Sequence, residues 1–138
     1  MEAMNYHLVF VYGTLRRGQY RDITNLEGVT AVGDGTISGQ IFSVAGGAFP
    51  GLALSDKGTV VGEVYQVIPE VLKRLDDIEG YREADPSSSF YLRKKVNVTM
   101  ADGTAKETWA YEAGRMAKGV FGPLIEGGDW VAHVKARG

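Results

Sequence analysis

Glu79 is the residue whose type and position most clearly suggest chemistry. It follows residues 69–78, in which apolar residues recur at helical spacing, and Gly80 then supplies a typical helix end. The predicted apolar face consists of Val71, Leu72, Leu75 and Ile78. At about 100° per residue, Glu79 lies about 50° from the centre of this face, whereas Asp77 lies about 150° away and Asp76 lies beyond the edge.

A carboxyl group on the apolar side of a helix is a candidate general acid or base. Partial burial raises the pKa of such a group, and the negative end of the helix dipole raises it further. Both effects move the pKa of Glu79 toward a value suited to proton transfer near neutral pH. The alternative is that the helix frays before Glu79, so that its side chain extends into water.

The tetrapeptide Tyr12-Gly13-Thr14-Leu15 is the second candidate site. Its first residue, Tyr12, is the last residue of the stretch 6–12 (YHLVFVY), whose β-branched and aromatic composition predicts a buried strand. A glycine-containing turn at a strand end can present successive backbone N–H groups to an anion such as a carboxylate. The same four residues also fit an ordinary turn between strand and loop. The sequence contains neither a Walker-type pattern nor a dinucleotide-binding glycine pattern, so phosphate binding is not indicated.

Several kinds of site are excluded by composition. The chain has no cysteine, which rules out disulfides, thiolate nucleophiles, zinc–thiolate sites and iron–sulfur clusters. The histidines are His7 and His133, at opposite ends of the chain and away from any metal-ligand pattern. A metal site and a histidine-based catalytic triad are therefore not expected. By themselves Tyr91, Trp109 and Tyr111 fit a hydrophobic core better than a pocket.

The elements that must position these candidates are mostly short strands. The 19 glycines indicate many turns and bulges, and Asp102-Gly103 is a strong hairpin signal. Glu63 and Gln66 are candidate outward positions, and residues 21–26 fit either a loop or a short helix. Stretches typical of strands cover residues 36–44, 51–54, 60–67, 91–100 and 105–111, and the tail holds residues 120–125. This pattern predicts an α+β fold with a small, curved or barrel-like sheet.

Size and charge describe an ordinary globular chain. Its 138 residues predict one domain spanning residues 1–138. The 15 basic and 17 acidic residues give a formal net charge of −2, without the basic excess expected of a nucleic-acid-binding protein. The longest N-terminal apolar run, residues 8–12, is too short for a signal peptide or a membrane span. We therefore expect a cytoplasmic protein with no membrane and no nucleic-acid partner.

The ordered set of motifs resembles the gamma-glutamylcyclotransferase-like family, in particular the branch containing gamma-glutamylamine cyclotransferase. The resemblance covers nearly the whole chain, and its order is more specific than any one motif. The motifs are Tyr12-Gly13-Thr14-Leu15, Phe49-Pro50-Gly51-Leu52, Val61-Gly62-Glu63-Val64-Tyr65, Leu75-Asp76-Asp77-Ile78-Glu79-Gly80-Tyr81, Tyr91-Leu92-Arg93, Trp109-Ala110-Tyr111 and Gly128-Asp129-Trp130.

The resemblance implies a small mixed β-barrel with flanking short helices and a cavity, acting without metal or cofactor. It implies that a gamma-glutamyl amide is cleaved by attack of its own α-amine, which releases 5-oxoproline and an amine or amino acid. Glu79 would be the general acid/base. The implied substrate-binding residues are Tyr12, Gly13, Thr14, Leu15 and Tyr111. Residues 20–24 and 45–48 depart from the family pattern, and we expect them to line the mouth of the cavity, where the leaving group would be recognised.

Three functional hypotheses follow. The first is the cyclotransferase with Glu79 as acid/base, acting on a small-molecule substrate without an obligate protein partner. The second is a non-catalytic protein of the same fold that binds a carboxylate-containing metabolite through residues 12–15. The third, an interaction protein that pairs through edge strands, has little support because short strands interrupted by glycine are poor docking edges. For the enzyme, the leaving group stays open among amines, amino acids and glutathione.

Overall fold

The computed structural model describes residues 5–137, and these form strands with a few short helices. The strands are β1 (His7–Val11), β2 (Val29–Val44), β3 (Phe49–Val67), β4 (Tyr91–Met100), β5 (Ala105–Ala113) and β6 (Phe121–Leu124). The helices are α1 (Pro69–Glu79), α2 (Arg115–Lys118) and α3 (Trp130–Ala136), and single 3₁₀ turns lie at Ile23–Asn25, Ala45–Gly47, Pro86–Ser88 and Glu126–Gly128. None of the helices within residues 5–137 has the length and apolarity that crossing a membrane requires.

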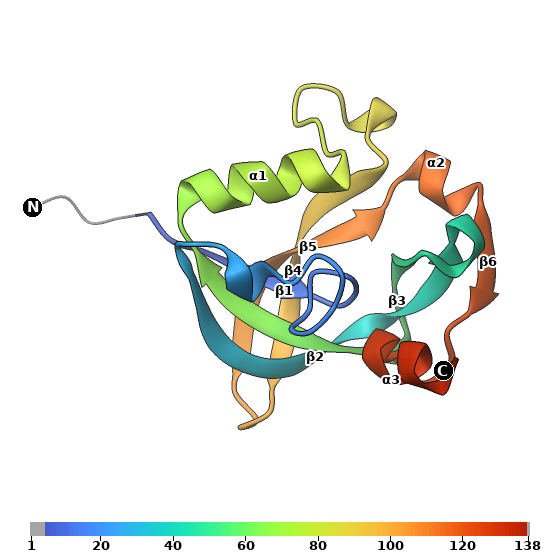
Figure 1. Ribbon diagram of the computed structural model, residues 1–138, viewed down its shortest axis with the longest axis horizontal. Helices are drawn as coiled ribbons and strands as arrows, with labels where there is room; N and C mark the ends of the chain where they lie inside the picture. The colour runs from blue at the N-terminus through green and yellow to red at the C-terminus, as the bar shows by residue number, and fades with distance from the viewer. Residues whose placement is uncertain (1–4, 138) are drawn as a thin grey trace, which may run out of the picture.

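The strands close into a small mixed barrel (Figure 1), as the sequence predicted. The sheet order is β3-β1-β5-β4-β2-β6, and an additional pairing of β2 with β3 joins the two ends of the five-stranded part. The pairing of β1 with β5 is parallel. The other pairings of the barrel are antiparallel: β1 with β3, β2 with β3, β2 with β4 and β4 with β5. The short strand β6 extends the sheet beside β2.

Strands β2 and β3 are longer than the stretches that the sequence predicted, and they pair as one long hairpin. β2 begins at Val29 rather than at residue 36, and the stretches expected at 51–54 and 60–67 belong to one strand, β3. The ladder shifts register between Ser38 and Gly39, where their partners change from Thr59 to Leu54. Gly39 has φ +152°, a conformation that favours glycine, and the irregularity lets the long hairpin bend around the barrel.

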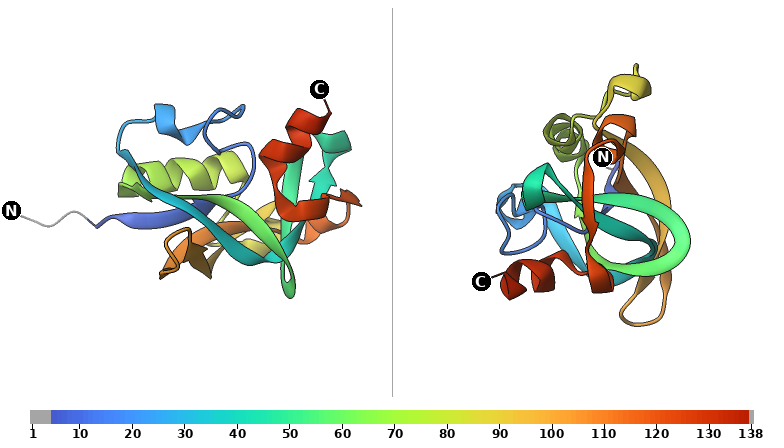
Figure 2. Two further views of the ribbon diagram at one scale, coloured as in Figure 1. Left: turned by 90° about the horizontal axis from the view of Figure 1, so that it is seen from below. Right: turned by 90° about the vertical axis from the view of Figure 1, so that its right-hand side faces the viewer.

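Two hydrophobic clusters lie on opposite faces of the barrel wall. Alternation along β1 sends Phe10 into the barrel and Val9 and Val11 outward. The inner cluster takes residues from all five barrel strands, including Ile37, Val64, Val98 and Ala110. The outer cluster joins β1, β3 and β5 to α1 and to the segment between β1 and β2, which lie on the same side of the barrel (Figure 2).

Helix α1 matches the predicted helix and extends it by one residue. Pro69 occupies its first turn, and Gly80, with φ 69°, ends it with an N–H that donates to the carbonyls of Asp76 and Asp77. The prediction was wrong for Ile78, which is 36% exposed because its side chain borders a cavity instead of packing on the barrel. Only Val71, Leu72 and Leu75 of α1 are buried.

The C-terminal segment forms two short helices that the sequence pattern did not reveal. Asp129 caps α3 by accepting a hydrogen bond from the N–H of Ala132, and Trp130 is buried in the inner cluster. His133 lies within α3. Helices of four and seven residues are too short to be stable alone, so packing on the barrel decides their formation.

Candidate active site

A cavity of about 250 Å³ lies between the C-terminal end of α1 and the barrel. Segments far apart in the sequence build it: the end of β1 and the following turn, the start of β3, the end of α1, the start of β4 and part of β5. The structure brings all the sequence-predicted site residues to its wall, namely Tyr12, Gly13, Thr14, Leu15, Glu79 and Tyr111.

Glu79 is the last residue of α1, so the helix does not fray before it. Burial raises the pKa of its carboxyl group to about 7, and the positive charge of Arg21 offsets this effect only in part. No hydrogen bond or ion pair from another residue within 5–137 occupies the carboxylate. Glu79 thus lines the cavity without a partner among these residues, and its pKa lies in the range that suits proton transfer near neutral pH.

The turn at residues 13–15 is held in place through its carbonyl groups. The carbonyl of Gly13 accepts from the N–H of Arg16 at 3.1 Å, that of Thr14 from Arg21 at 2.8 Å and that of Leu15 from Ile23 at 3.1 Å. Within the described part of the chain, the N–H groups of residues 13–15 donate no such bond. No acceptor within residues 5–137 uses these donors, which an anion-binding turn requires.

Gly13 fits this turn because a larger residue would not. A Cβ atom there would lie 2.6 Å from Cγ of Pro50, which also lines the cavity. The close approach of the turn to Pro50 therefore requires a residue without a side chain.

Three tyrosines form the buried wall of the cavity. The hydroxyl of Tyr12 donates to the carbonyl of Tyr111 at 2.6 Å, and it accepts from the N–H of Leu52 at 3.2 Å. The hydroxyl of Tyr91 donates to the carbonyl of Pro50 at 2.7 Å. Burial raises the pKa of Tyr12, Tyr91 and Tyr111 well above the ordinary value, so all three stay neutral. Tyr91 and Tyr111 are thus both core and cavity residues, whereas Trp109 does not line the cavity.

Asp76 links α1 to the barrel one turn before Glu79. Its Oδ1 accepts a hydrogen bond from the hydroxyl of Tyr111 at 2.7 Å, and its Oδ2 accepts from the guanidinium of Arg93 at 2.8 Å. Burial raises the pKa of Asp76, and the hydrogen bond from Tyr111 and the charge of Arg93 oppose that shift. The sequence placed Asp76 beyond the apolar face, but the spacing could not reveal these partners on β4 and β5.

Arg21 is a cavity residue that sequence analysis did not single out. It lies in the segment 20–24, which was expected at the mouth of the cavity, and its exposed side chain does border the opening. The same expectation was wrong for residues 45–48, which do not line the cavity. They form the tip of the β2–β3 hairpin, where the carbonyl of Gly47 accepts a hydrogen bond from Arg137 at 2.7 Å.

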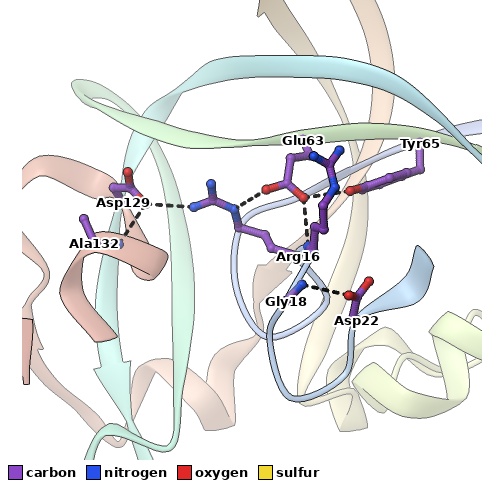
Figure 3. Close-up of polar contacts among 8 residues, drawn as sticks. Arg16, Gly18, Asp22, Glu63, Tyr65, Asp129 and Ala132 are labelled. Atoms are coloured by element: carbon purple, nitrogen blue, oxygen red, sulfur yellow. Dashed lines mark hydrogen bonds and ion pairs between the residues drawn. The ribbon is translucent and has the colours of Figure 1, made fainter. Parts of the chain in front are cut away.

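A buried ion-pair network fixes the loop that follows the turn (Figure 3). Arg16 lies between two carboxylates: its Nε donates to Glu63 at 2.8 Å, and its Nη1 donates to Asp129 at 2.8 Å. Glu63 also accepts from the N–H of Arg17 at 3.0 Å and from the hydroxyl of Tyr65 at 2.8 Å. Burial alone would raise the pKa of Glu63, but these hydrogen bonds and the charge of Arg16 lower it.

The position of Glu63 corrects a prediction. Glu63 and Gln66 were candidate outward positions, which implies exposure to solvent. Glu63 is only 7% exposed, whereas Gln66 is partly exposed. Glu63 and Tyr65 lie on the same face of β3, away from the barrel interior, and the loop that contains Arg16 covers that face. The sequence showed the alternation but not the covering loop.

Within residues 5–137, no group of three or more His, Asp or Glu side chains is arranged to hold a metal ion. The charged side chains lining the cavity are Glu79 and Arg21, and its remaining walls are aromatic, aliphatic and backbone groups. The site therefore combines one carboxylate of raised pKa, one guanidinium and a row of backbone donors.

Comparison with known proteins gives consistent matches over most of the chain. Residues 9–132 match the family described as "Gamma-glutamyl cyclotransferase, AIG2-like". A putative gamma-glutamylcyclotransferase of Methanocaldococcus jannaschii is 32% identical over 123 residues, which cover 88% of this chain and 93% of that protein. The gamma-L-glutamyl-butirosin B gamma-glutamyl cyclotransferase of Niallia circulans is 33% identical over 96 residues, 70% of this chain and 60% of that enzyme. The crystal structure of an AIG2-like protein from Mus musculus superposes with a TM-score of 0.67 at 28% identity, covering 84% of each chain.

Proposed function

Because the chain belongs to the gamma-glutamyl cyclotransferase, AIG2-like family, we propose that it cleaves a gamma-glutamyl amide by cyclisation, with Glu79 as general acid/base. The observation that supports this most directly is the meeting of two complementary groups in one cavity. One is the carboxyl of Glu79, which has a pKa of about 7 and no partner within residues 5–137. The other is the row of N–H groups at residues 13–15, which no acceptor in that part of the chain uses.

Substrate binding follows from these two groups. The α-carboxylate of the glutamyl moiety accepts hydrogen bonds from the N–H groups of Gly13, Thr14 and Leu15. Its α-ammonium group lies against the carboxylate of Glu79. The neutral tyrosine walls at Tyr12, Tyr91 and Tyr111 confine the glutamyl chain in a folded-back conformation. Such confinement brings the α-nitrogen to the γ-carbonyl carbon and supplies several kcal/mol through orientation.

The reaction moves two protons away from the α-nitrogen. Glu79 takes the first from the α-ammonium, and the resulting amine attacks the γ-carbonyl carbon to form a five-membered ring. Protonated Glu79 gives this proton to the leaving nitrogen as its bond to the γ-carbon breaks. The ring nitrogen, which carries two hydrogens and a positive charge after the attack, then loses the second proton to the regenerated carboxylate of Glu79, which passes it to solvent. The products are 5-oxoproline and a free amine or amino acid. The substrate provides the nucleophile, so the proposal requires no nucleophilic side chain and no cofactor.

The test compares wild type with Glu79→Gln, which keeps the size of the side chain and removes the basic carboxylate. A panel of gamma-glutamyl amines, gamma-glutamyl amino acids and glutathione is assayed for release of 5-oxoproline. We expect release by wild type and a loss of about 10²–10⁴-fold in kcat for the variant. Asp77→Asn is the matched control, because Asp77 is an exposed carboxylate two residues earlier on α1.

Activity of Glu79→Gln equal to wild type would contradict the mechanism. Absence of 5-oxoproline with every substrate, together with calorimetric binding of glutamate that is lost in a Gly13→Ala variant, would instead identify a metabolite-binding protein. The free N–H groups at residues 13–15 are the observation that supports this second function.

A further inference from the structure

The charged groups of the cavity lie at different depths. Glu79 borders the buried tyrosine wall, whereas the side chain of Arg21 is exposed at the opening. A ligand whose reacting end lies at Glu79 therefore extends its other end past Arg21.

The backbone at Arg21 is fixed by the same loop that presents the free N–H groups. The N–H of Arg21 donates to the carbonyl of Thr14 at 2.8 Å. The next residue, Asp22, accepts from the N–H of Gly18 at 2.7 Å (Figure 3), and Ile23 is 1% exposed in the outer cluster. Arg21 is thus attached to the cavity wall at its main chain, while its side chain remains accessible.

The guanidinium of Arg21 has no carboxylate partner among the described residues. Arg16 and Arg93, by contrast, form ion pairs with Asp or Glu at 2.8 Å. The guanidinium of Arg21 lies over the exposed ring of the neighbouring Tyr20, 5.9 Å from its centroid. Its charge and its planar row of donors are therefore available to an anionic group of a ligand.

We propose that Arg21 binds a carboxylate on the leaving group, so that the preferred substrates are gamma-glutamyl amino acids or peptides. The inference rests on the proposed function, in which the two charged groups of the glutamyl moiety are already bound at Glu79 and at residues 13–15. The leaving group then occupies the opening, where Arg21 is the charged side chain. A cationic amine in that place would meet a like charge, which disfavours it.

The test uses two substrates that differ by one carboxylate, gamma-glutamyl-alanine and gamma-glutamyl-ethylamide. We expect wild type to prefer the alanine compound in kcat/KM. Arg21→Gln should reduce that preference about 10-fold, mainly through KM, as expected for the loss of a charge-assisted hydrogen bond. Arg74→Gln is the matched control, since Arg74 is an exposed arginine of α1 outside the cavity, and it should leave the preference within about twofold. Melting curves of both variants check that the fold is intact.

Equal losses on both substrates in Arg21→Gln would overturn the inference, because they would assign Arg21 to the glutamyl moiety or to the loop. If wild type releases 5-oxoproline from neither compound, the proposed function fails for these substrates, and calorimetry with the same two compounds decides about Arg21. Tighter binding of gamma-glutamyl-alanine, lost in Arg21→Gln, would still support the inference. Equal binding of the two compounds, or no binding, would overturn it.

Discussion

Glu79 connects local sequence with the chemistry of the cavity. Its carboxyl group has a pKa of about 7 because it is buried, and an acid/base group works best when its pKa lies near the operating pH. In the proposed mechanism Glu79 is the general base, so it must be unprotonated at the start of the reaction. We therefore expect kcat/KM to rise with pH through about 7 and to level above it. A rate profile between pH 5 and 9 measures this, and a profile that is flat between pH 6 and 8 would contradict it.

The same burial makes Glu79 a source of pH-dependent stability. Its pKa in the folded protein, about 7, is higher than the ordinary value of 4.5, so the folded state holds the proton more tightly than the unfolded state. The contribution of this group to stability is therefore greatest below pH 4.5, and this contribution is lost as the pH rises to 7. Relative to wild type, Glu79→Gln should gain about 1–3 kcal/mol in unfolding free energy between pH 5 and 8. Urea unfolding at both pH values measures the gain; an equal difference at both would contradict the assignment.

Asp76 acts on the site as a positioning residue. Its carboxylate holds Tyr111 in the cavity wall and pairs with Arg93, whose side chain is 12% exposed. Asp76→Asn should cost about 2–3 kcal/mol of stability, because it leaves a largely buried guanidinium without its counter-charge. Tyr111→Phe removes only one hydrogen bond and should cost about 1 kcal/mol. Chemical denaturation of both variants measures the two losses of unfolding free energy, and a smaller loss for Asp76→Asn than for Tyr111→Phe would contradict this prediction.

At the scale of elements, the loop after β1 is the part that must be held still. It provides both the N–H row at residues 13–15 and Arg21, yet it is a loop without a long helix or strand of its own. Ion pairs of Arg16 connect it to Glu63 on β3 and to Asp129 at the start of α3. Three elements from the beginning, middle and end of the chain are thereby joined at one guanidinium.

A double-mutant cycle measures that connection. Arg16→Met should destabilise the protein by about 3 kcal/mol, because it leaves the buried carboxylate of Glu63 without its counter-charge. Glu63→Gln should cost less, because Arg16 keeps its ion pair with Asp129, and the double variant should cost less than the sum of the two. The control pair is Lys95 and Glu107, which are 48% and 66% exposed and 4.0 Å apart. Their coupling should stay below about 0.5 kcal/mol. Additive costs for Arg16 and Glu63 would show that they do not act as a pair.

At the scale of the whole molecule, the barrel depends on close contact between β1 and β3. A Cβ atom at Gly62 would collide with the carbonyl oxygen of Val11 and lie 2.6 Å from the ring of Phe10. Gly62→Ala should therefore destabilise the fold by about 1–3 kcal/mol. The control, Gly119→Ala, adds a Cβ atom 3.4 Å from its nearest neighbour and should change stability by less than about 0.5 kcal/mol. Thermal unfolding compares the two, and equal effects would contradict the packing argument.

The sequence by itself determined the features that depend on neighbouring residues. The hairpin at Asp102-Gly103, strand β4 and helix α1 with its Gly80 cap follow from turn chemistry, alternation and helical spacing. Helical spacing also placed Glu79 beside the buried face, and the ordered motifs indicated the family that the comparisons then showed.

Only the tertiary structure decided the features that depend on residues far apart in the chain. It gathered Tyr12, Glu79 and Tyr111 around one cavity, because barrel closure brings the ends of β1, α1 and β5 together. It also buried Glu63 beneath the loop of Arg16. The physical reason is that local propensity fixes an element's conformation and faces, whereas long-range packing fixes what covers each face.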